Sequence, residues 1–172
     1  MALMRILHYP DPVLLRKAEP IVTIDDNVRS LARDMAETMY AAPGVGLAAP
    51  QVGISQRLIV VDCARKEEPP ALIVAVNPEI VASSGSSCEE EGCLSVPGYY
   101  TSVERAARVS VKFLDLHGQP RQIEAEGLLA VAFQHEIDHL EGILFIDRIS
   151  SLRKGIFRRK YRKLQEQQKE QL

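Results

Sequence analysis

The sequence lacks the features of a membrane protein and of a disulfide-stabilised protein. No apolar run approaches the roughly 20 residues of a membrane-spanning helix, so we expect no membrane association. Three cysteines (Cys63, Cys88 and Cys93) form an odd, sparse set, which argues against a disulfide framework and for a reducing compartment. The first eight residues show no basic segment leading into an apolar one and no small-residue cleavage site. We therefore expect a cytoplasmic protein.

Charge is distributed unevenly along a chain of otherwise ordinary composition. The 172 residues fit one domain with a tail, and 46% hydrophobic and 26% charged residues are typical of a globular protein. Residues 148–172 carry nine Lys or Arg against two Glu, whereas residues 1–147 carry twelve against 21 Asp or Glu. We expect a catalytic domain over 1–150 and a basic helical tail over 151–172 that meets any anionic partner. The alternative is a solvated helix whose charges serve only solubility.

Three segments have helical patterns. Apolar residues recur at helical spacing over residues 25–42, where Pro43-Gly44 ends the pattern. Residues 128–141 are apolar around most of the helix, which predicts a helix in the core. From residue 152 a third helix is predicted, with Phe157, Tyr161 and Leu164 on one stripe and basic residues elsewhere.

The first two-thirds of the chain also contain strand patterns. Residues 57–62 and 71–76 are β-branched runs, and residues 109–113 alternate with period two. Residues 44–51 read as a glycine-punctuated loop and residues 83–87 as a short flexible connection. Strands followed by a late, buried helix predict an α+β domain and not an alternating βαβ fold.

The strongest local signal is His135-Glu136-Ile137-Asp138-His139. Helix residues four apart differ by about 40° around the axis, so the two imidazoles can bind one metal ion. Glu136 can reach a metal-bound water without binding the metal, which suits a general base. Two solvent-facing histidines are the alternative, which the apolar preceding turn disfavours.

A metal site needs a third ligand. The 33 residues after His139 contain no His or Cys, and among their carboxylates only Asp147 is suitably placed. Upstream, Cys93 follows Gly92, which permits close backbone approach. A thiolate and two imidazoles leave one coordination position for water, as in a catalytic site.

Two other kinds of metalloprotein fit parts of this pattern. Cys88, Cys93, His135 and His139 could form a structural zinc site in a ribosome- or RNA-associated module. However, 41 residues separate Cys93 from His135, where a zinc finger has about 12 to 15. A metallopeptidase of the HExxH type is the other alternative, although it usually has its third ligand downstream. Cys63, at the end of an apolar strand, is expected in the core.

Three motifs, in this order, resemble those of the peptide deformylases: Gly44-Val45-Gly46-Leu47-Ala48-Ala49-Pro50-Gln51, Glu91-Gly92-Cys93-Leu94-Ser95 and His135-Glu136-Ile137-Asp138-His139. The resemblance covers about residues 4–150. It implies an α+β fold in which antiparallel or mixed sheets surround a central helix that carries the histidine motif, with further helices near both ends. It also implies a hydrolase that removes the N-formyl group from the initiator methionine of nascent chains and releases formate.

The resemblance further implies the roles of individual residues. Cys93, His135 and His139 would bind one divalent metal, Fe(II) in the cell, with Zn, Ni or Co as possible substitutes. Metal-bound hydroxide would attack the formyl carbon while Glu136 acts as general base and then acid. The Gln51 side-chain amide and the Leu94 backbone N–H would stabilise the developing oxyanion.

Substrate binding is expected to use backbone groups, because many nascent sequences must be accepted. Val45 and Gly92 match family positions whose main-chain groups pair with an extended peptide and add it as a strand, and Gly46 is a further substrate-binding candidate. Leu128, Val131 and Ala132 match the methionine pocket, although a plain core role fits them equally well. The stretch Pro97-Gly98-Tyr99-Tyr100 offers tyrosine where some relatives have a peptide-contacting arginine, so the resemblance does not extend to contacts beyond the first two substrate residues.

Further residues are expected to support the site. Arg105 could pair with Glu91 and fix the orientation of Cys93, and Asp138 could join them, although surface ion pairing is the alternative. In bacterial relatives a basic C-terminal helix docks on the ribosome, and the residues expected to meet rRNA phosphates here are Arg153, Lys154, Arg158, Arg159, Lys160, Arg162 and Lys163. No DNA partner is expected.

Overall fold

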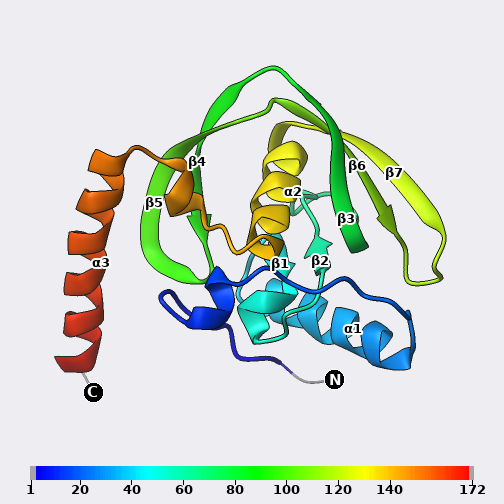
Figure 1. The fold of residues 1–172 in the computed structure, drawn as a ribbon, viewed down its shortest axis with the longest axis horizontal. Coiled ribbons are helices and arrows are strands. Elements are labelled where there is room, and N and C mark those ends of the chain that lie inside the picture. The colour runs from blue at the N-terminus through cyan, green and yellow to red at the C-terminus, as the bar shows by residue number, and fades with distance from the viewer. Residues whose placement is uncertain (1–2, 171–172) are drawn as a thin grey trace.

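The computed structural model describes residues 3–170 and has an α+β fold with two antiparallel sheets (Figure 1). The larger sheet contains, in spatial order, β1 (Gly46–Ala48), β2 (Leu58–Val61), β3 (Ile73–Ser84), β6 (Arg108–Leu114) and β7 (Pro120–Glu126). The smaller sheet contains β4 (Ser87–Cys93) and β5 (Val96–Arg105). The predicted α+β class is therefore confirmed.

Helices cover both faces of the larger sheet. The side chains of Leu58 and Val60 in β2 pack in the cluster that contains the buried face of α1 (Asp26–Ala41). The alternate residues Ile59 and Val61 pack in the cluster that contains α2 (Gly127–Leu140). Because β2 is covered on both faces, it is apolar at every position and shows no alternation.

Helix α2 is the central element, and ten of its 14 residues are buried. Its apolar side chains Ala130, Phe133, Ile137 and Leu140 pack against the larger sheet. Figure 1 shows the helix enclosed by the long strands that pass over it and descend on either side. The same helix also carries four buried polar side chains on its last two turns, namely His135, Glu136, Asp138 and His139.

Helix α1 follows the predicted bounds closely. The Asp25 carboxylate caps it by accepting from the Val28 N–H at 3.1 Å. Helix α2 is likewise where it was predicted, and Gly142, with φ of 75°, follows its end.

Two segments predicted to be irregular are part of the sheets. The glycine-punctuated segment contains strand β1 and a 3₁₀ helix, Ala49–Val52, and so is not simply a loop. Residues 83–87 are also mostly strand: β3 continues to Ser84 and β4 begins at Ser87. Across this point the β3–β6 ladder continues into the β4–β5 ladder, with Gly85 (φ of 71°) at the bend. Small and polar composition concealed these strands, because it lacks the β-branched runs that indicate a strand.

Helix α3 (Ser151–Glu170) lies beside the smaller sheet, away from α1 (Figure 1). Its buried Phe157 and Tyr161 pack in an aromatic cluster with Tyr9, Tyr99 and Phe145. Arg153 adds hydrogen bonds to Thr101 and, at 2.7 Å, to the Ser102 carbonyl of β5. One side of the helix is thus fixed to the body. None of the helices within residues 3–170 is long and apolar enough to cross a bilayer.

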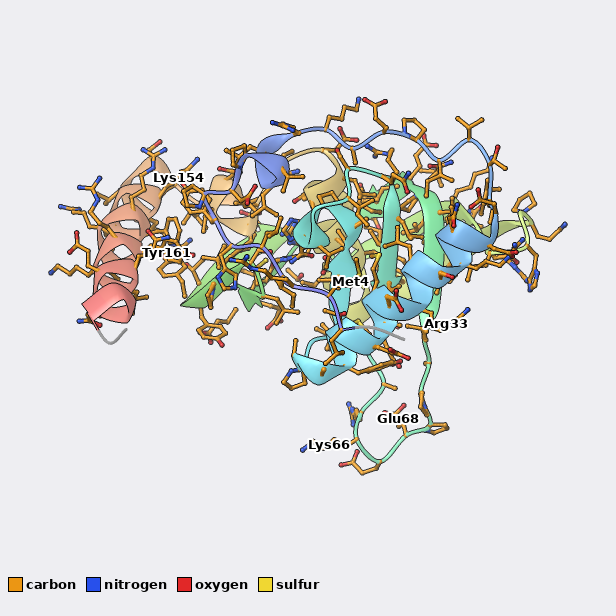
Figure 2. The ribbon with its side chains drawn as sticks, turned by 90° about the horizontal axis from the view of Figure 1, so that it is seen from below. Met4, Arg33, Lys66, Glu68, Lys154 and Tyr161 are labelled. Carbon is orange, nitrogen blue, oxygen red and sulfur yellow. The ribbon has the colours of Figure 1, made fainter. Side chains whose placement is uncertain are left out.

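The loop between β2 and β3 projects from the body, with Lys66 and Glu68 near its tip (Figure 2). Its base is closed by the Asp62 carboxylate, which accepts from the Tyr40 hydroxyl at 2.5 Å and from two backbone N–H groups. Burial would raise the pKa of Asp62, but these hydrogen bonds outweigh it and hold the pKa below its usual value. Burial and the bond to Asp62 raise the pKa of Tyr40 to about 12.

Replacing this hydroxyl tests the loop closure. Tyr40→Phe should lower the free energy of unfolding by about 1 kcal/mol at neutral pH. Stability from a carboxylate with a depressed pKa is present above about pH 4 and is lost as the pH falls through its folded pKa. The deficit measured by urea unfolding should therefore shrink in acid.

Tyr161→Phe is the matched control, because that hydroxyl donates to the neutral Tyr9 carbonyl at 3.1 Å. Its deficit should not depend on pH. If the loss of unfolding free energy in Tyr40→Phe stays constant down to the lowest pH at which the protein is folded, the assigned hydrogen bond is wrong.

Candidate metal centre

Helix α2 and strand β4 bring three ligand side chains to one point. One ligand atom from each of Cys93, His135 and His139 lies within 4.8 Å of the others. The Cys93 Sγ is 3.4 Å from His139 Nε2, close to the separation of two ligands on one tetrahedral ion. The helix supplies the two histidines one turn apart, and the end of β4 supplies the thiol.

The orientation of His135 is fixed by a carboxylate behind it. Its Nδ1 lies 3.0 Å from Glu91 Oε1, which leaves Nε2 to face the other ligands. Glu91 in turn accepts two hydrogen bonds from Arg105, at 2.6 and 2.9 Å. The predicted pair of Arg105 and Glu91 therefore exists, but Glu91 contacts His135 and not Cys93.

Asp138 extends this network to a residue that the sequence did not single out. It accepts from buried Arg105 at 3.0 Å and from Arg148 at 2.7 and 3.1 Å. The two carboxylates of Glu91 and Asp138 are thus matched by two guanidinium groups. No helical or strand periodicity links Arg148 to Asp138. In the sequence, only the positive charge of Arg148 could have indicated this contact.

The two histidines have opposite pKa shifts. Burial favours the neutral form of both. For His135 the neighbouring Glu136, Cys93 and Glu91 outweigh burial and raise the pKa well above its usual value. For His139, burial and then the positive charges of His135 and Arg105 hold the pKa well below its usual value. This environment favours the neutral imidazole of His139, the form that binds metals.

Glu136 is buried beside the ligands, and burial raises its pKa to about 7. Its Oε1 has no hydrogen-bond partner among the described residues, and the same holds for His139 Nδ1. Strand β1 approaches the carboxylate so closely that a methyl group at Gly46 would lie 2.5 Å from Oε2. Glycine at this position therefore leaves the space that the carboxylate occupies.

Gln51 is held with its amide nitrogen towards the ligands. Its Oε1 accepts from the Ala48 N–H at 2.9 Å, which directs Nε2 to Ser95 Oγ at 3.1 Å and Cys93 Sγ at 3.7 Å. The neighbouring Leu94 N–H has no partner within residues 3–170. Of the two donors predicted from sequence, the Gln51 amide lies beside the Cys93 thiol and the Leu94 N–H follows Cys93 in the chain, and Ser95 is an additional contact of Gln51 that was not predicted.

A cavity of about 700 Å³ opens beside the three ligands. It lies between the free edge of β1 and the edge of β4 that does not pair with β5. Leu128, Val131 and Ala132 of α2 form part of its wall, and it is also lined by Val45, Gly46, Gln51, Glu91, Gly92, Cys93, Leu94, His135 and Glu136.

Within β1, the residue that offers backbone groups to the cavity edge can be identified. The Val45 carbonyl accepts from the Asp62 N–H at 2.9 Å, so it is directed towards β2. Successive strand residues direct their backbone groups to opposite edges. The N–H and C=O of Gly46 therefore face the free edge. Contrary to the expectation from sequence, the main chain of Val45 is directed towards β2, and Val45 offers its half-exposed side chain to the cavity instead.

Other candidate ligands do not join the group. Cys88 is exposed, and the only cluster of three metal-binding side chains in the described chain is Cys93, His135 and His139. Asp147 instead accepts from the Leu144 N–H and from Lys154. Cys63 is partly buried against the core, as expected.

The residues present fit a metal ion. A thiol and two imidazoles converge, one imidazole is oriented by a carboxylate, and Glu136 Oε1 is buried with no partner in the described chain. Sulfur and nitrogen donors suit a soft or borderline divalent ion such as Zn(II) or Fe(II).

Comparison with known proteins gives one consistent result. The sequence profile of the family described as polypeptide deformylase matches residues 3–155. The chain is 54% identical to a peptide deformylase of Thermodesulfovibrio yellowstonii, over 94% of this chain and 98% of that protein. It is 54% identical to one of Syntrophobacter fumaroxidans, over 95% and 96% of the two chains.

Solved structures agree. A peptide deformylase from Legionella pneumophila, 51% identical, superposes with a TM-score of 0.89 over 97% of this chain and 98% of the other. A peptide deformylase from Ehrlichia chaffeensis in complex with actinonin is 38% identical. It superposes with a TM-score of 0.89 over 95% of this chain and 98% of the other.

The carboxylate behind His135 can be tested by removing its charge. Glu91→Gln should weaken Zn(II) binding about 10–100-fold, because the imidazole loses its orienting anion. It should also lower the free energy of unfolding by about 3–5 kcal/mol, because Arg105 keeps a buried charge with one carboxylate fewer. Chelator competition and denaturant unfolding measure the two effects. Glu89→Gln, an exposed glutamate of the same strand, is the matched control; equal Zn(II) affinities of the two variants would refute the role.

Proposed function

The chain belongs to the peptide deformylase family, metal-dependent hydrolases that remove the formyl group from N-terminal methionine, and we propose that Cys93, His135 and His139 are its metal ligands. The convergence of these three side chains beside the cavity is the observation that supports this assignment. Fe(II) is the ion that we propose for the cell, with Zn, Ni or Co as substitutes. When bound, such an ion lowers the pKa of a water molecule towards 7 and polarises the formyl carbonyl.

Glu136 is the proton-transfer group in this proposal. Its carboxylate is buried at the cavity wall and its Oε1 has no protein partner in the described chain, so it can accept a proton from water there. The same carboxyl group then delivers the proton to the departing amine. Gly46 leaves the room that the carboxylate occupies, because a Cβ there would clash with it.

Gln51 and Leu94 are proposed to stabilise the oxygen of the formyl group as negative charge develops on it. The Gln51 side-chain nitrogen is directed at the ligands by the bond from Ala48 to its oxygen, so it needs no reorganisation when charge develops. The Leu94 N–H, which has no partner within residues 3–170, is available for the same oxygen.

The formylated peptide is proposed to bind as an extended strand between the edges of β1 and β4. Gly46 offers backbone hydrogen bonds from one edge and Gly92 from the other, while the exposed Val45 side chain contacts the peptide. Leu128, Val131 and Ala132 supply the apolar wall for the methionine side chain. Because the peptide backbone carries the contacts, many sequences after methionine can be accepted.

Glu136→Ala tests both the reaction and the base. With formyl-Met-Ala-Ser as substrate, the wild-type protein loaded with Fe(II) or Ni(II) under anaerobic conditions should release formate. The variant should lower kcat by about 10²–10⁴-fold with its metal content unchanged. Glu141→Ala, an exposed glutamate after the same helix, should keep wild-type kcat. Release of free amino acids in place of formate would indicate a metallopeptidase, and full activity of Glu136→Ala would exclude Glu136 as the base.

The basic tail, residues 151–172, is proposed to be a functional unit distinct from the catalytic domain, residues 1–150, and to bind the ribosome in the cytoplasm. The burial of Phe157 and Tyr161 fixes one side of α3, so the opposite side faces solvent. That side carries exposed basic residues, namely Arg158, Arg159, Lys160, Arg162 and Lys163. Such a cluster can contact rRNA phosphates and would place the enzyme near emerging chains.

Substituting these five basic residues by serine or glutamine tests the tail without removing its buried anchors. Ribosome pelleting should weaken at least tenfold at physiological salt, and wild-type binding should fall as salt rises. Deformylation of a free tripeptide should not change. Undiminished pelleting of the variant would show that α3 is not the anchor.

A further inference from the structure

The two histidines of the metal centre are held in different ways. His135 Nδ1 contacts Glu91, whereas His139 Nδ1 is buried and has no hydrogen-bond partner among residues 3–170. A ligand imidazole is usually oriented through its second nitrogen, and His139 lacks that support from the protein. The position of His139 therefore depends on the main chain of α2, whose last helical residue, Leu140, follows directly.

The end of α2 is held from outside the helix. The last carbonyls of a helix have no partner within it, so an end that carries a ligand needs contacts from other segments. The Leu140 carbonyl has two: it accepts from the Ala18 N–H at 2.8 Å and from Arg57 Nη1 at 3.1 Å. Arg57 is thus the side chain that joins the larger sheet to the turn that carries His139.

Arg57 is itself fixed at the start of β2. Its N–H donates to the Glu19 carbonyl at 2.9 Å, and its carbonyl accepts from the Asn77 N–H at 2.8 Å. Only 13% of its side chain is exposed. The main chain therefore places the guanidinium, and the planar group keeps its donors in a fixed arrangement.

The ion pair of Arg57 with Glu141 is the weaker of its two contacts. Nη2 donates to Glu141 Oε1 at 2.8 Å, but the Glu141 side chain is 38% exposed and also lies 3.7 Å from Lys17 Nζ. Ion pairs that reach solvent contribute little. The bond to the Leu140 carbonyl is therefore the contact that holds the helix end.

We propose that Arg57 is a positioning residue of the metal centre, which holds the last turn of α2 so that His139 stays at ligand distance from Cys93. These two ligands come from different elements, and His139 Nε2 lies 3.4 Å from Cys93 Sγ. A small displacement of the helix end would change this distance, because no contact at His139 Nδ1 within the described chain opposes it. The inference rests on the proposed ligand assignment.

Arg57→Met tests the role, because methionine keeps an apolar stem but has no N–H group. The Leu140 carbonyl retains its bond from Ala18, so the variant should fold. Its Zn(II) affinity, measured by chelator competition, should fall about tenfold, at the lower end of the effects of residues that support a ligand. The visible absorption of the Co(II)-loaded protein should also change, because its d–d bands depend on the arrangement of the ligands.

Three further variants locate the effect. Arg57→Lys keeps a charged donor and should recover most of the affinity and the wild-type Co(II) spectrum. Arg57→Gln, whose side chain is too short for the carbonyl, should show the same losses as Arg57→Met and so provides a second, polar replacement. Glu141→Ala removes only the ion pair and should bind Zn(II) like the wild-type protein.

Arg29→Met is the matched control for stability. Arg29 also donates to a backbone carbonyl, that of Leu116, and to a carboxylate, that of Asp26. It belongs to α1, which packs on the opposite face of the larger sheet from α2. Arg29→Met should lower the free energy of unfolding of the metal-free protein, measured in urea, and leave Zn(II) affinity and the Co(II) spectrum unchanged.

The outcomes separate the positioning role from the ligand assignment. Wild-type Zn(II) affinity and Co(II) spectrum in Arg57→Met would overturn the role of Arg57 and leave the ligands intact. An equal loss of affinity in Arg29→Met would also overturn it, because the loss would then follow from stability alone. Failure of the folded wild-type protein to bind one Zn(II), or a Co(II) spectrum without thiolate charge transfer, would instead overturn the proposed metal centre.

Discussion

The burial of four polar side chains on one apolar helix is the constraint on which the rest of the structure depends. Helix α2 enters the core through Ala130 and Phe133 and then places His135, Glu136, Asp138 and His139 in the interior. Unpaired charges there would cost several kcal/mol each. The fold meets this cost by bringing Glu91, Arg105 and Arg148 to the helix from three other segments.

This requirement explains the shape of the long strands. Arg105 ends β5 and Glu91 lies near the end of β4, so both reach α2 only because the β3–β6 ladder bends at Gly85 and continues as the smaller sheet. The same bend delivers Cys93 to the histidines. One change of strand direction thus positions a ligand, the carboxylate that orients another ligand, and the guanidinium that balances the carboxylate.

Sequence reasoning recovered the parts of the molecule that are encoded locally. The periodicity of α1, its Asp25 cap and the apolar run of α2 are properties of consecutive residues, and all three are present in the structure. The three motifs predicted a shared site, and the structure brings their side chains together. The strands β1, β4, β5 and β7 were not predicted, because glycine, proline, serine and glutamate interrupt the runs of β-branched residues that indicate a strand.

Sequence reasoning also missed individual side-chain contacts. Arg148 binds Asp138 from a 3₁₀ turn beyond the end of α2, and the Gln51 amide is oriented by the Ala48 backbone and Ser95. The Arg148 contact has no spacing rule, because it depends on where the chain returns after the helix. The Ala48–Gln51 bond, in contrast, has the three-residue spacing of a capping box, whereas the contact to Ser95 joins separate segments. Glu91 was expected to support Cys93, its near neighbour in sequence, yet its carboxylate lies 3.0 Å from His135 Nδ1.

The site is therefore divided by burial into two parts with different freedom to change. The groups that carry the chemistry lie in the interior, and Gln51, Glu91 and Asp138 are each held by two or more hydrogen bonds, so altering one leaves a buried partner unsatisfied. Val45, Glu90, Tyr100 and Leu128 are exposed at the cavity, and their side chains can change without creating such a defect. An enzyme that processes many nascent chains needs this separation, because its preference for the residues after methionine can then shift while the metal site stays fixed.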